Sequence, residues 1–281
     1  MKWYGVIGLI AIVLAEIGLF FNIDPINSWY YPIIWFGLIF FVDALVFSLS
    51  NRSLLTSGYK KVVWLFILST VIWWTFEIIE KLLINSWTMQ DSIFNMPYQL
   101  VLFKTIRYMP FVVALFELFD LVKVLHHFDK WKLDKKHEIS KTLILVMLSI
   151  GIVSLLLTVF YPAKFFWAVW IAFFFLLDPI NYINKTHSII RHLKDRKLKT
   201  PLTLTFAALI FGLLNEYWNF WDVNGWTYHL TYLNFLKIFE MPILGYLGYV
   251  FFAFEAYAFY YFLKFYIKKI HLKLCQWDDG I

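Results

Sequence analysis

Residues 29–49 read WYYPIIWFGLIFFVDALVFSL, a stretch that is apolar along its whole length apart from Asp43. A helix of about 20 apolar residues is long enough to cross the hydrocarbon core of a bilayer. So many apolar side chains in a row must face something other than water. Residues 29–49 therefore predict a transmembrane helix.

Seven other stretches have the same character. The eight predicted spans are residues 3–21, 29–49, 62–83, 100–125, 142–161, 165–183, 201–218 and 241–267. Of the whole chain, 61% of residues are apolar and 16% are charged, and the mean hydropathy is +0.67, whereas charged residues make up about a quarter of an average soluble domain. This composition excludes a disordered chain and a soluble nucleic-acid binder. The single cysteine, Cys275, excludes an internal disulfide and a thiolate metal site.

The basic residues predict the orientation of the eight spans. An even number of spans puts both termini and the second, fourth and sixth loops on one side, and all but five of the 25 Lys and Arg residues fall there. The five on the opposite side are Lys81, Lys104, Arg107, Lys164 and Lys237. By the positive-inside rule, we expect a multi-pass protein of the cell membrane with both termini in the cytoplasm. Its basic loops would contact anionic lipid head groups rather than a nucleic acid.

Two halves of the sequence echo each other. The motif of Asp43 and Ser53-Leu54-Leu55 recurs 135 residues later as Asp178 and Ser188-Ile189-Ile190. A second motif recurs 139 residues later: Glu77, Asn85 and Trp87 correspond to Glu216, Asn224 and Trp226. In addition, Met109-Pro110 corresponds to Met241-Pro242, and Glu117 to Glu255. We therefore predict an all-α, polytopic transmembrane helix bundle of eight spans, built as a four-plus-four repeat. The repeats are residues 1–125 and 142–267 within one membrane domain, residues 1–281. Because each half has an even number of spans, both halves cross the membrane in the same orientation. They would be related by a pseudo-twofold axis along the membrane normal, and such an axis predicts a shared site between the halves near the midplane.

Acidic residues inside the predicted spans are the strongest functional signal. An ionised group at the bilayer centre costs about 2.5 to 3.5 kcal/mol even on the lenient insertion scale, so these acids must face inward. Span direction divides them into an outer set, Glu77, Glu80 and Glu216 with the nearby Glu240, and an inner polar cluster, Asp43, Asp178, Glu117 and Glu255. Glu216, Glu77 and Glu240 are the candidate catalytic acids. The alternative is that these carboxylates clasp helices through hydrogen bonds.

Aromatic rings and two cations crowd the outer acids. The candidate substrate-binding residues are Trp74, Trp218, Trp221, Asn219, Trp226, Trp87, Arg107 and His229. Interfacial aromatic belts account for many such rings, but they do not account for the run Asn215-Glu216-Tyr217-Trp218-Asn219-Phe220-Trp221. A ring-lined pocket with a poised acid can protonate a double bond and hold the resulting cation. The same pocket could bind a lipid without reacting.

Several well-known motifs are missing from the sequence. It has no phosphate-binding Gly-Lys-Ser loop, no Gly-x-Gly-x-x-Gly fingerprint, no His-Glu-x-x-His pair and no Asp-rich motif for magnesium diphosphate. A lone histidine, His229, lies by the outer acids, which is too little for a metal site. We therefore expect no cofactor and no metal.

Two resemblances follow from these segments. The run from Trp226 to Leu230, the run Lys237 to Tyr249 with Phe254-Glu255, and Leu177-Asp178-Pro179-Ile180-Asn181-Tyr182 resemble a family of polytopic bacterial membrane proteins without an assigned activity. Both halves more distantly resemble the integral-membrane lycopene cyclase domain, in which an Asp, a Trp-containing turn and a proline follow one another. Asp178, Trp226 and Pro242 have that order, as do Asp43, Trp87 and Pro110. The cyclases carry Pro-x-Glu-Glu, whereas Pro242 here is followed by Gly245-Tyr246-Leu247-Gly248 and no acid pair.

The resemblance implies a redox-neutral, proton-initiated cyclisation of a polyene or isoprenoid lipid, with no metal and no nucleotide. Glu216 or Glu77 would donate the proton, and Trp218, Trp221 and Trp74 would stabilise the cation. The alternative is a proton-coupled transporter or a lipid-binding membrane protein without catalysis. In either case the expected partners are membrane lipids or an isoprenoid.

Overall fold

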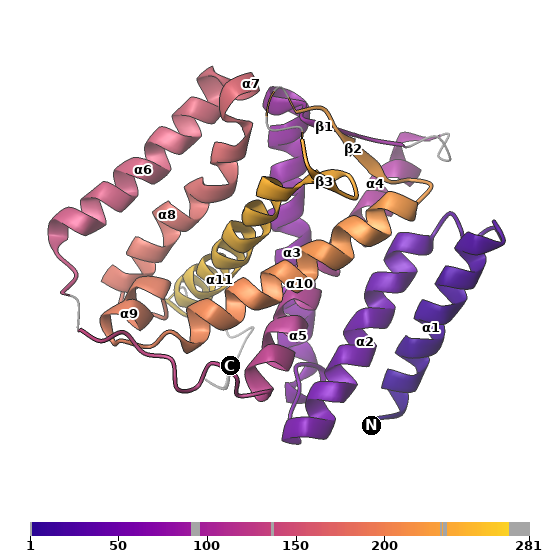
Figure 1. The fold of residues 1–281 in the computed structure, drawn as a ribbon, viewed down its shortest axis with the longest axis horizontal. Helices are drawn as coiled ribbons and strands as arrows, with labels where there is room; N and C mark the ends of the chain where they lie inside the picture. The colour runs from indigo at the N-terminus through magenta and orange to yellow at the C-terminus, as the bar shows by residue number, and fades with distance from the viewer. Residues whose placement is uncertain (1, 91–95, 136–137, 231, 233–234, 270–281) are drawn as a thin grey trace. The chain divides into compact units, whose positions relative to one another are not determined.

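The computed structural model describes residues 2–90, 96–135, 138–230, 232 and 235–269, and it is mostly helical (Figure 1). Cys275 lies outside the described residues. Within the described part, six helical segments are long and apolar enough to cross a membrane: Trp3–Phe20, Tyr30–Ser50, Tyr59–Ile84, Lys141–Phe160, Pro162–Ile183 and Ile243–Ile267. The expected all-helical fold is confirmed, and its long apolar helices are those of a membrane protein.

The chain forms two compact units, which are described one at a time. Unit 1 takes in the described residues of Met1–Leu125 and Ile210–Tyr246, and unit 2 those of His126–Leu209 and Leu247–Ile281. Unit 1 contains α1 (Trp3–Phe20), α2 (Tyr30–Ser50), η1 (Leu55–Ser57), α3 (Tyr59–Ile79), η2 (Glu80–Ile84), β1 (Trp87–Met89), α4 (Pro97–Tyr108), α5 (Phe111–Val124), the end of α10 (Lys199–Trp221), β2 (Trp226–Tyr228), β3 (Lys237–Ile238), β4 (Met241–Pro242) and η4 (Ile243–Gly245). Unit 2 contains α6 (Lys141–Phe160), α7 (Pro162–Phe165), η3 (Phe166–Ala168), α8 (Val169–Ile183), α9 (Ile189–Lys194), the start of α10, and α11 (Tyr246–Lys269) except its first residue.

In unit 1, α1 packs closely on α2 because small residues line the contact. The buried positions of α1 are Gly5, Gly8, Ala15 and Gly18. A Cβ atom at Gly8 would lie 2.5 Å from the backbone oxygen of Gly37 in α2. Small residues allow two helix backbones to approach without the hydrophobic driving force that water supplies to soluble proteins. The other faces of α1 carry exposed apolar side chains, as expected of a helix that contacts lipid.

The predicted span 100–125 is broken into α4 and α5 at Met109-Pro110. Proline has no N–H group, so it cannot make the hydrogen bond that would continue a helix through this point. The Ser69 side chain from α3 bridges the break: its hydroxyl donates to the Tyr108 backbone oxygen at 2.7 Å and accepts from the Val112 N–H at 3.0 Å. Such a partner is needed because an unpaired backbone group is costly where no water is present.

The two short strands β1 and β2 pair with a symmetric register. Trp87 lies opposite Tyr228, Thr88 opposite Thr227, and Met89 opposite Trp226. At the offset of 139 found in the sequence, Trp87 corresponds to Trp226 and Met89 to Tyr228. Each residue thus pairs with the counterpart of its partner, which is the pattern that a twofold axis through the Thr88 and Thr227 positions produces.

The hydrogen bonds around the strands follow the same symmetry. Gln90 donates its backbone N–H to the Gly225 oxygen, and its counterpart His229 donates to the oxygen of Ser86, the counterpart of Gly225. The Trp87 N–H is bonded to the Glu80 side chain at 2.9 Å, and the Trp226 N–H to the Asn219 side chain at 2.7 Å. Glu80 and Asn219 are again 139 residues apart, so the two segments make matching contacts.

Asp43 in unit 1 and Asp178 in unit 2 also play equivalent local roles. An Asp43 carboxylate oxygen accepts the Leu55 N–H at 2.8 Å, and an Asp178 oxygen accepts the Ile190 N–H at 2.9 Å. Leu55 and Ile190 occupy the same place in the two repeated motifs. Each carboxylate therefore holds the turn that follows its own helix, and Asp178 also satisfies an N–H group at the start of α9.

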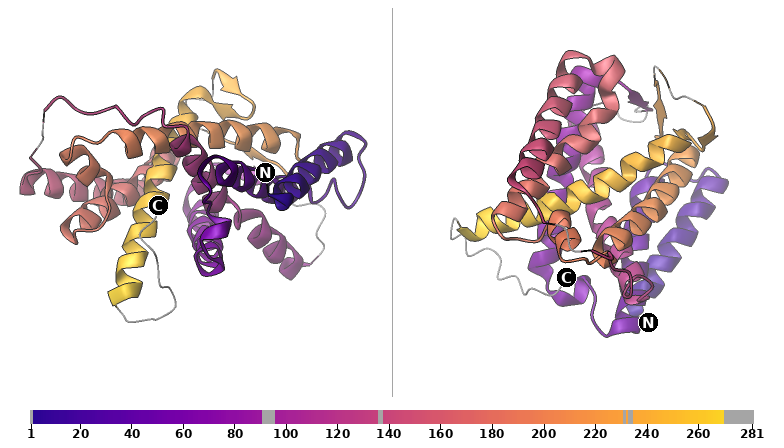
Figure 2. Two further views of the ribbon diagram at one scale, coloured as in Figure 1. Left: turned by 90° about the horizontal axis from the view of Figure 1, so that it is seen from below. Right: turned by 60° about the vertical axis from the view of Figure 1, so that its left-hand side comes forward.

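In unit 2, α6 and α8 lie side by side, as Figures 1 and 2 show. Gly151 of α6 makes the contact close, since a Cβ atom there would lie 2.6 Å from the Leu176 side chain. α8 is joined to α11 by two polar contacts: Asn181 donates to the Ala258 oxygen at 2.8 Å, and the Phe173 N–H donates to Glu255 at 3.2 Å. Both polar side chains are buried in this helix contact.

Candidate functional site

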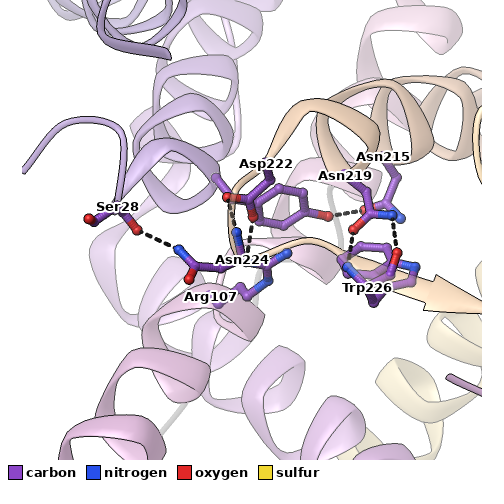
Figure 3. A network of polar contacts seen from close by, with 8 residues as sticks. Ser28, Arg107, Asn215, Asn219, Asp222, Asn224 and Trp226 are labelled. Carbon is purple, nitrogen blue, oxygen red and sulfur yellow. Dashed lines mark hydrogen bonds and ion pairs between the residues drawn. The ribbon is translucent and has the colours of Figure 1, made fainter. Parts of the chain in front are cut away.

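A connected group of buried polar side chains lies in unit 1 where α10 ends and β2 begins. We call it the Arg107 network and define it as Tyr31, Arg107, Asn215, Asn219, Asp222, Asn224 and Trp226. Figure 3 labels all of these except Tyr31, together with Ser28. Its members come from α2, α4, the last turns of α10 and the segment that leads into β2. Six of the seven are polar, yet all are buried.

Arg107 and Asp222 form the centre of the network. The Arg107 Nη1 donates to the Asp222 Oδ2 at 2.6 Å, and the two side chains are 0% and 1% exposed. Asp222 also accepts a hydrogen bond from the Asn224 backbone N–H at 3.1 Å, and the Asn224 side-chain nitrogen donates to the Ser28 backbone oxygen at 3.0 Å. These hydrogen bonds link the ion pair, through Asn224, to Ser28, which precedes α2 in the chain.

Two aromatic rings cover the guanidinium of Arg107. Its central carbon lies 4.0 Å from the centre of the Tyr31 ring and 5.3 Å from that of the Trp226 ring. The Tyr31 hydroxyl donates to the Asn215 side chain. A cation over ring faces is favourable when both are removed from water. The cation in these contacts is the protein's own Arg107, whereas the sequence predicted rings around a cation formed on the substrate.

Asn219 orders the strand that carries Trp226. Its side-chain oxygen accepts the Trp226 N–H at 2.7 Å, and its side-chain nitrogen donates to the Trp226 backbone oxygen at 2.9 Å. This double contact closes the turn between α10 and β2. Gly225 is required in the turn because a Cβ atom there would lie 2.4 Å from the Asn219 backbone oxygen.

Glu216 lies at the end of a short chain of side-chain hydrogen bonds. The Trp226 indole N–H donates to the Tyr228 hydroxyl at 2.7 Å, and that hydroxyl donates to a Glu216 oxygen at 2.8 Å. Glu216 is 0% exposed. A carboxyl group that accepts one hydroxyl in a dry, ring-rich setting can hold a proton and release it to a substrate.

The other two candidate acids lie in different settings. Glu77 is mostly buried and forms an ion pair with Lys104 at 2.9 Å. Glu240 is partly exposed and lies 3.8 Å from the Lys237 amino group. A carboxylate in an ion pair is better suited to holding a cation than to donating a proton, so the geometry separates Glu216 from these two.

The remaining predicted site residues divide between the interior and the surface. Trp218 is buried against Trp35, with ring centres 5.0 Å apart, and the Trp74 indole donates to Thr105 at 3.1 Å. Trp221 is 52% exposed, so the structure does not bring it into the buried group. Trp87 is partly exposed in β1, and His229 is exposed, with a ring nitrogen 2.7 Å from the Thr88 hydroxyl.

The inner acids belong to separate units. Asp43 and Glu117 are in unit 1, Asp178 and Glu255 are in unit 2, and all four are at most 1% exposed. Asp43 accepts hydrogen bonds from Tyr4 and Ser53 besides that from Leu55. These contacts show that Asp43 and Asp178 stabilise the turns that follow their helices.

Sequence reasoning missed Asp222 and Tyr31 of the Arg107 network, and it missed the partly buried Tyr228 as the hydrogen-bond partner of Glu216. Asp222 follows the predicted span 201–218, so it is not among the acids expected inside the membrane. α10 in fact continues to Trp221, and the spacing of three residues between Asn219 and Asp222 was a signal that both lie on one helix face. Tyr31 is far away in the sequence, and nothing local marks it.

Among the described residues, no group of three or more His, Cys, Asp and Glu side chains is arranged to hold a metal ion. Comparisons with models of known protein families, with curated proteins and with solved structures find no match.

Proposed function

We propose that the protein is a lycopene cyclase-like membrane enzyme that isomerises a polyene or isoprenoid lipid, with Glu216 as the proton donor. The observation that carries the proposal is the setting of Glu216: a fully buried carboxyl group bonded to the Tyr228 hydroxyl, which is bonded in turn to the Trp226 indole. In such a dry site a protonated carboxyl group can serve as a general acid.

The proposed reaction is balanced without a co-reactant. The Glu216 carboxyl group protonates a terminal double bond of the polyene and leaves a carbocation. A neighbouring double bond attacks this cation and closes a ring, and loss of a proton to the Glu216 carboxylate restores the acid. Ring faces such as that of Trp218 stabilise the transient carbocation. The product is an isomer of the substrate.

The proposal includes an architecture of eight spans in a four-plus-four repeat, in the cell membrane, with both termini in the cytoplasm. The symmetric register of β1 and β2 and the matching contacts of Asp43 and Asp178 support the repeat. The excess of Lys and Arg in the predicted cytoplasmic loops supports the orientation.

A second candidate function is lipid binding or proton-coupled transport without catalysis. The break between α4 and α5 favours it, because interrupted transmembrane helices commonly form the binding sites of transporters. Arg107 lies two residues before Met109, at the end of the first half-helix. A buried cation at that place is suited to holding a polar group of a ligand.

Isoprenoid profiling by mass spectrometry tests the proposal. Lycopene-producing bacteria would express the wild type, Glu216→Gln, Glu77→Gln or no protein, and membrane levels of each protein would be matched. We expect a new isomer of unchanged mass with the wild type and with Glu77→Gln, and none with Glu216→Gln. Gln at position 216 keeps an oxygen for the Tyr228 hydroxyl, so its loss of product reports the proton and not the fold.

Absence of the new isomer with correctly inserted wild-type protein would refute lycopene cyclisation and favour lipid binding or transport. An isomer formed equally by Glu216→Gln would refute the role of Glu216 while retaining the enzyme.

A further inference from the structure

One edge of the Arg107 guanidinium makes no hydrogen bond within the part of the chain that the structure describes. The Nη1 atom is bonded to Asp222, whereas Nε and Nη2 are buried and have no hydrogen-bond partner among the residues that the structure describes. Nε and Nη2 lie on the same edge of the planar group, and their N–H bonds point in parallel. This edge is the one with which arginine makes its two-pronged contacts.

Leaving this edge empty is unfavourable. A guanidinium cannot give up its proton in a protein, so both N–H groups remain donors. Burying such donors without an acceptor costs free energy that folding must offset. The rings of Tyr31 and Trp226 cover the guanidinium but accept no conventional hydrogen bond from its edge. An oxygen atom from outside the protein would satisfy both donors.

The charges around Arg107 favour a neutral oxygen. Asp222 already neutralises Arg107, and Glu77 neutralises Lys104 one turn earlier in α4. A phosphate or carboxylate would add a negative charge without a cation to balance it. A carbonyl or hydroxyl oxygen has two lone pairs for the two N–H groups and brings no charge.

The residues next to Asp222 in the sequence are apolar and exposed. Asp222 is flanked in sequence by Trp221 and Val223, which are 52% and 38% exposed. Exposed apolar side chains next to the network are better suited to contact with the chain of a lipid than with a charged solute.

We propose that the Nε and Nη2 edge of Arg107 binds the neutral carbonyl or hydroxyl oxygen of an isoprenoid lipid. The choice of an isoprenoid chain rests on the proposed function, whereas the demand for a neutral oxygen rests on Arg107 itself. The inference narrows the substrate class from any polyene to one that carries an oxygen.

Binding of a ketone and its matching hydrocarbon tests the inference. The full-length protein in detergent micelles would be titrated with farnesylacetone, an isoprenoid ketone, and with the same chain carrying a methylene in place of the carbonyl. We expect the ketone to bind the wild type roughly ten- to a hundredfold more tightly, the range for hydrogen bonds to a charged donor. The infrared stretch of an isotope-labelled carbonyl should move to lower frequency on binding.

Arg107→Lys keeps the charge and removes the two-pronged edge, so it should abolish both the preference for the ketone and the infrared shift. Lys81→Gln, which removes an exposed cation of the same unit, should change neither. The wild-type comparison of ketone and hydrocarbon needs no variant, so the inference stays testable even where Arg107→Lys misfolds.

Equal binding of ketone and hydrocarbon would overturn the inference and indicate that water fills the edge. Tighter, Arg107-dependent binding of farnesyl phosphate would overturn the neutral class in favour of an anion. Both outcomes concern binding alone. They are therefore distinguishable from failure of the proposed function, which is read from product formation.

Discussion

Replacing Asp222 by Ala should destabilise unit 1 more than any other single change in the network, because it leaves the Arg107 charge buried. The Arg107 Nη1 and Asp222 Oδ2 atoms are 2.6 Å apart, and neither side chain is more than 1% exposed. Removing one partner of a buried ion pair costs about 3–5 kcal/mol. Asp222 also accepts the Asn224 N–H, a bond that contributes about 1 kcal/mol. The free energy of unfolding should therefore fall by about 4–6 kcal/mol.

A double-mutant cycle separates the ion pair from the loss of packing. Arg107→Met leaves Asp222 without its cation and should also be destabilising. The double variant Arg107→Met with Asp222→Ala has no buried charge left, so it should be more stable than the sum of the two single changes predicts. For a pair at this distance we expect a coupling of about 2–3 kcal/mol.

Unfolding by SDS in mixed micelles, followed by tryptophan fluorescence, measures these differences. An exposed ion pair serves as the control: Asp129 lies 2.5 Å from the Lys199 amino group, with both side chains more than a third exposed. Asp129→Ala should leave the free energy of unfolding nearly unchanged, because water screens exposed pairs. A loss below about 1 kcal/mol for Asp222→Ala, or additive effects in the cycle, would refute a buried, charged pair.

Three further predictions concern packing, the helix break and pH. Gly8→Ala should lower the free energy of unfolding by about 1–3 kcal/mol, because the new Cβ atom would lie 2.5 Å from the backbone of α2. Gly248→Ala should be neutral or stabilising, because a Cβ atom there has no neighbour within 4 Å, and equal effects of the two changes would contradict the close contact at Gly8. Ser69→Ala should cost about 2 kcal/mol by releasing the two backbone groups at the α4–α5 break, and an unchanged SDS unfolding curve would count against the bridge. Burial lowers the pKa of His192 from 6.5 to about 4, with a smaller contribution from neighbouring cations. Between these pH values the unfolded chain binds a proton at His192 that the folded protein does not, so the free energy of unfolding should fall as the pH drops from 6.5 towards 4. Unfolding curves recorded at several pH values should show that this free energy depends less steeply on pH in His192→Gln than in the wild type.

The helices were readable from the sequence because their signal is local. Stretches such as residues 29–49 carry enough apolar side chains to require a helix in lipid, whatever their neighbours do. The repeat stays a prediction, and some of the residues matched in it make equivalent contacts: Trp87 and Trp226 each donate a backbone N–H to a side chain seven residues earlier. The break at Met109-Pro110 was visible as a proline in an apolar stretch, but the predicted span 100–125 ran straight through it.

The sequence also placed Glu216, Asn219, Trp226 and Arg107 in one region, since they come from the same predicted ends of spans. It did not reveal their partners. Tyr31 is 184 residues from Asn215, and Asp222 is 115 residues from Arg107. Trp221 lies in the same run as Trp218, but helical geometry turns it outward, where it is 52% exposed.

By itself the sequence determined that this chain is helical and that several of its helices are long and apolar enough to cross a membrane. Hydropathy and periodicity are properties of neighbouring residues, so no fold is needed to read them. Only the tertiary structure decided that Arg107 pairs with Asp222 and that, among the described residues, nothing accepts from one edge of its guanidinium. Which donors find acceptors depends on side chains from distant segments, and packing alone brings these together.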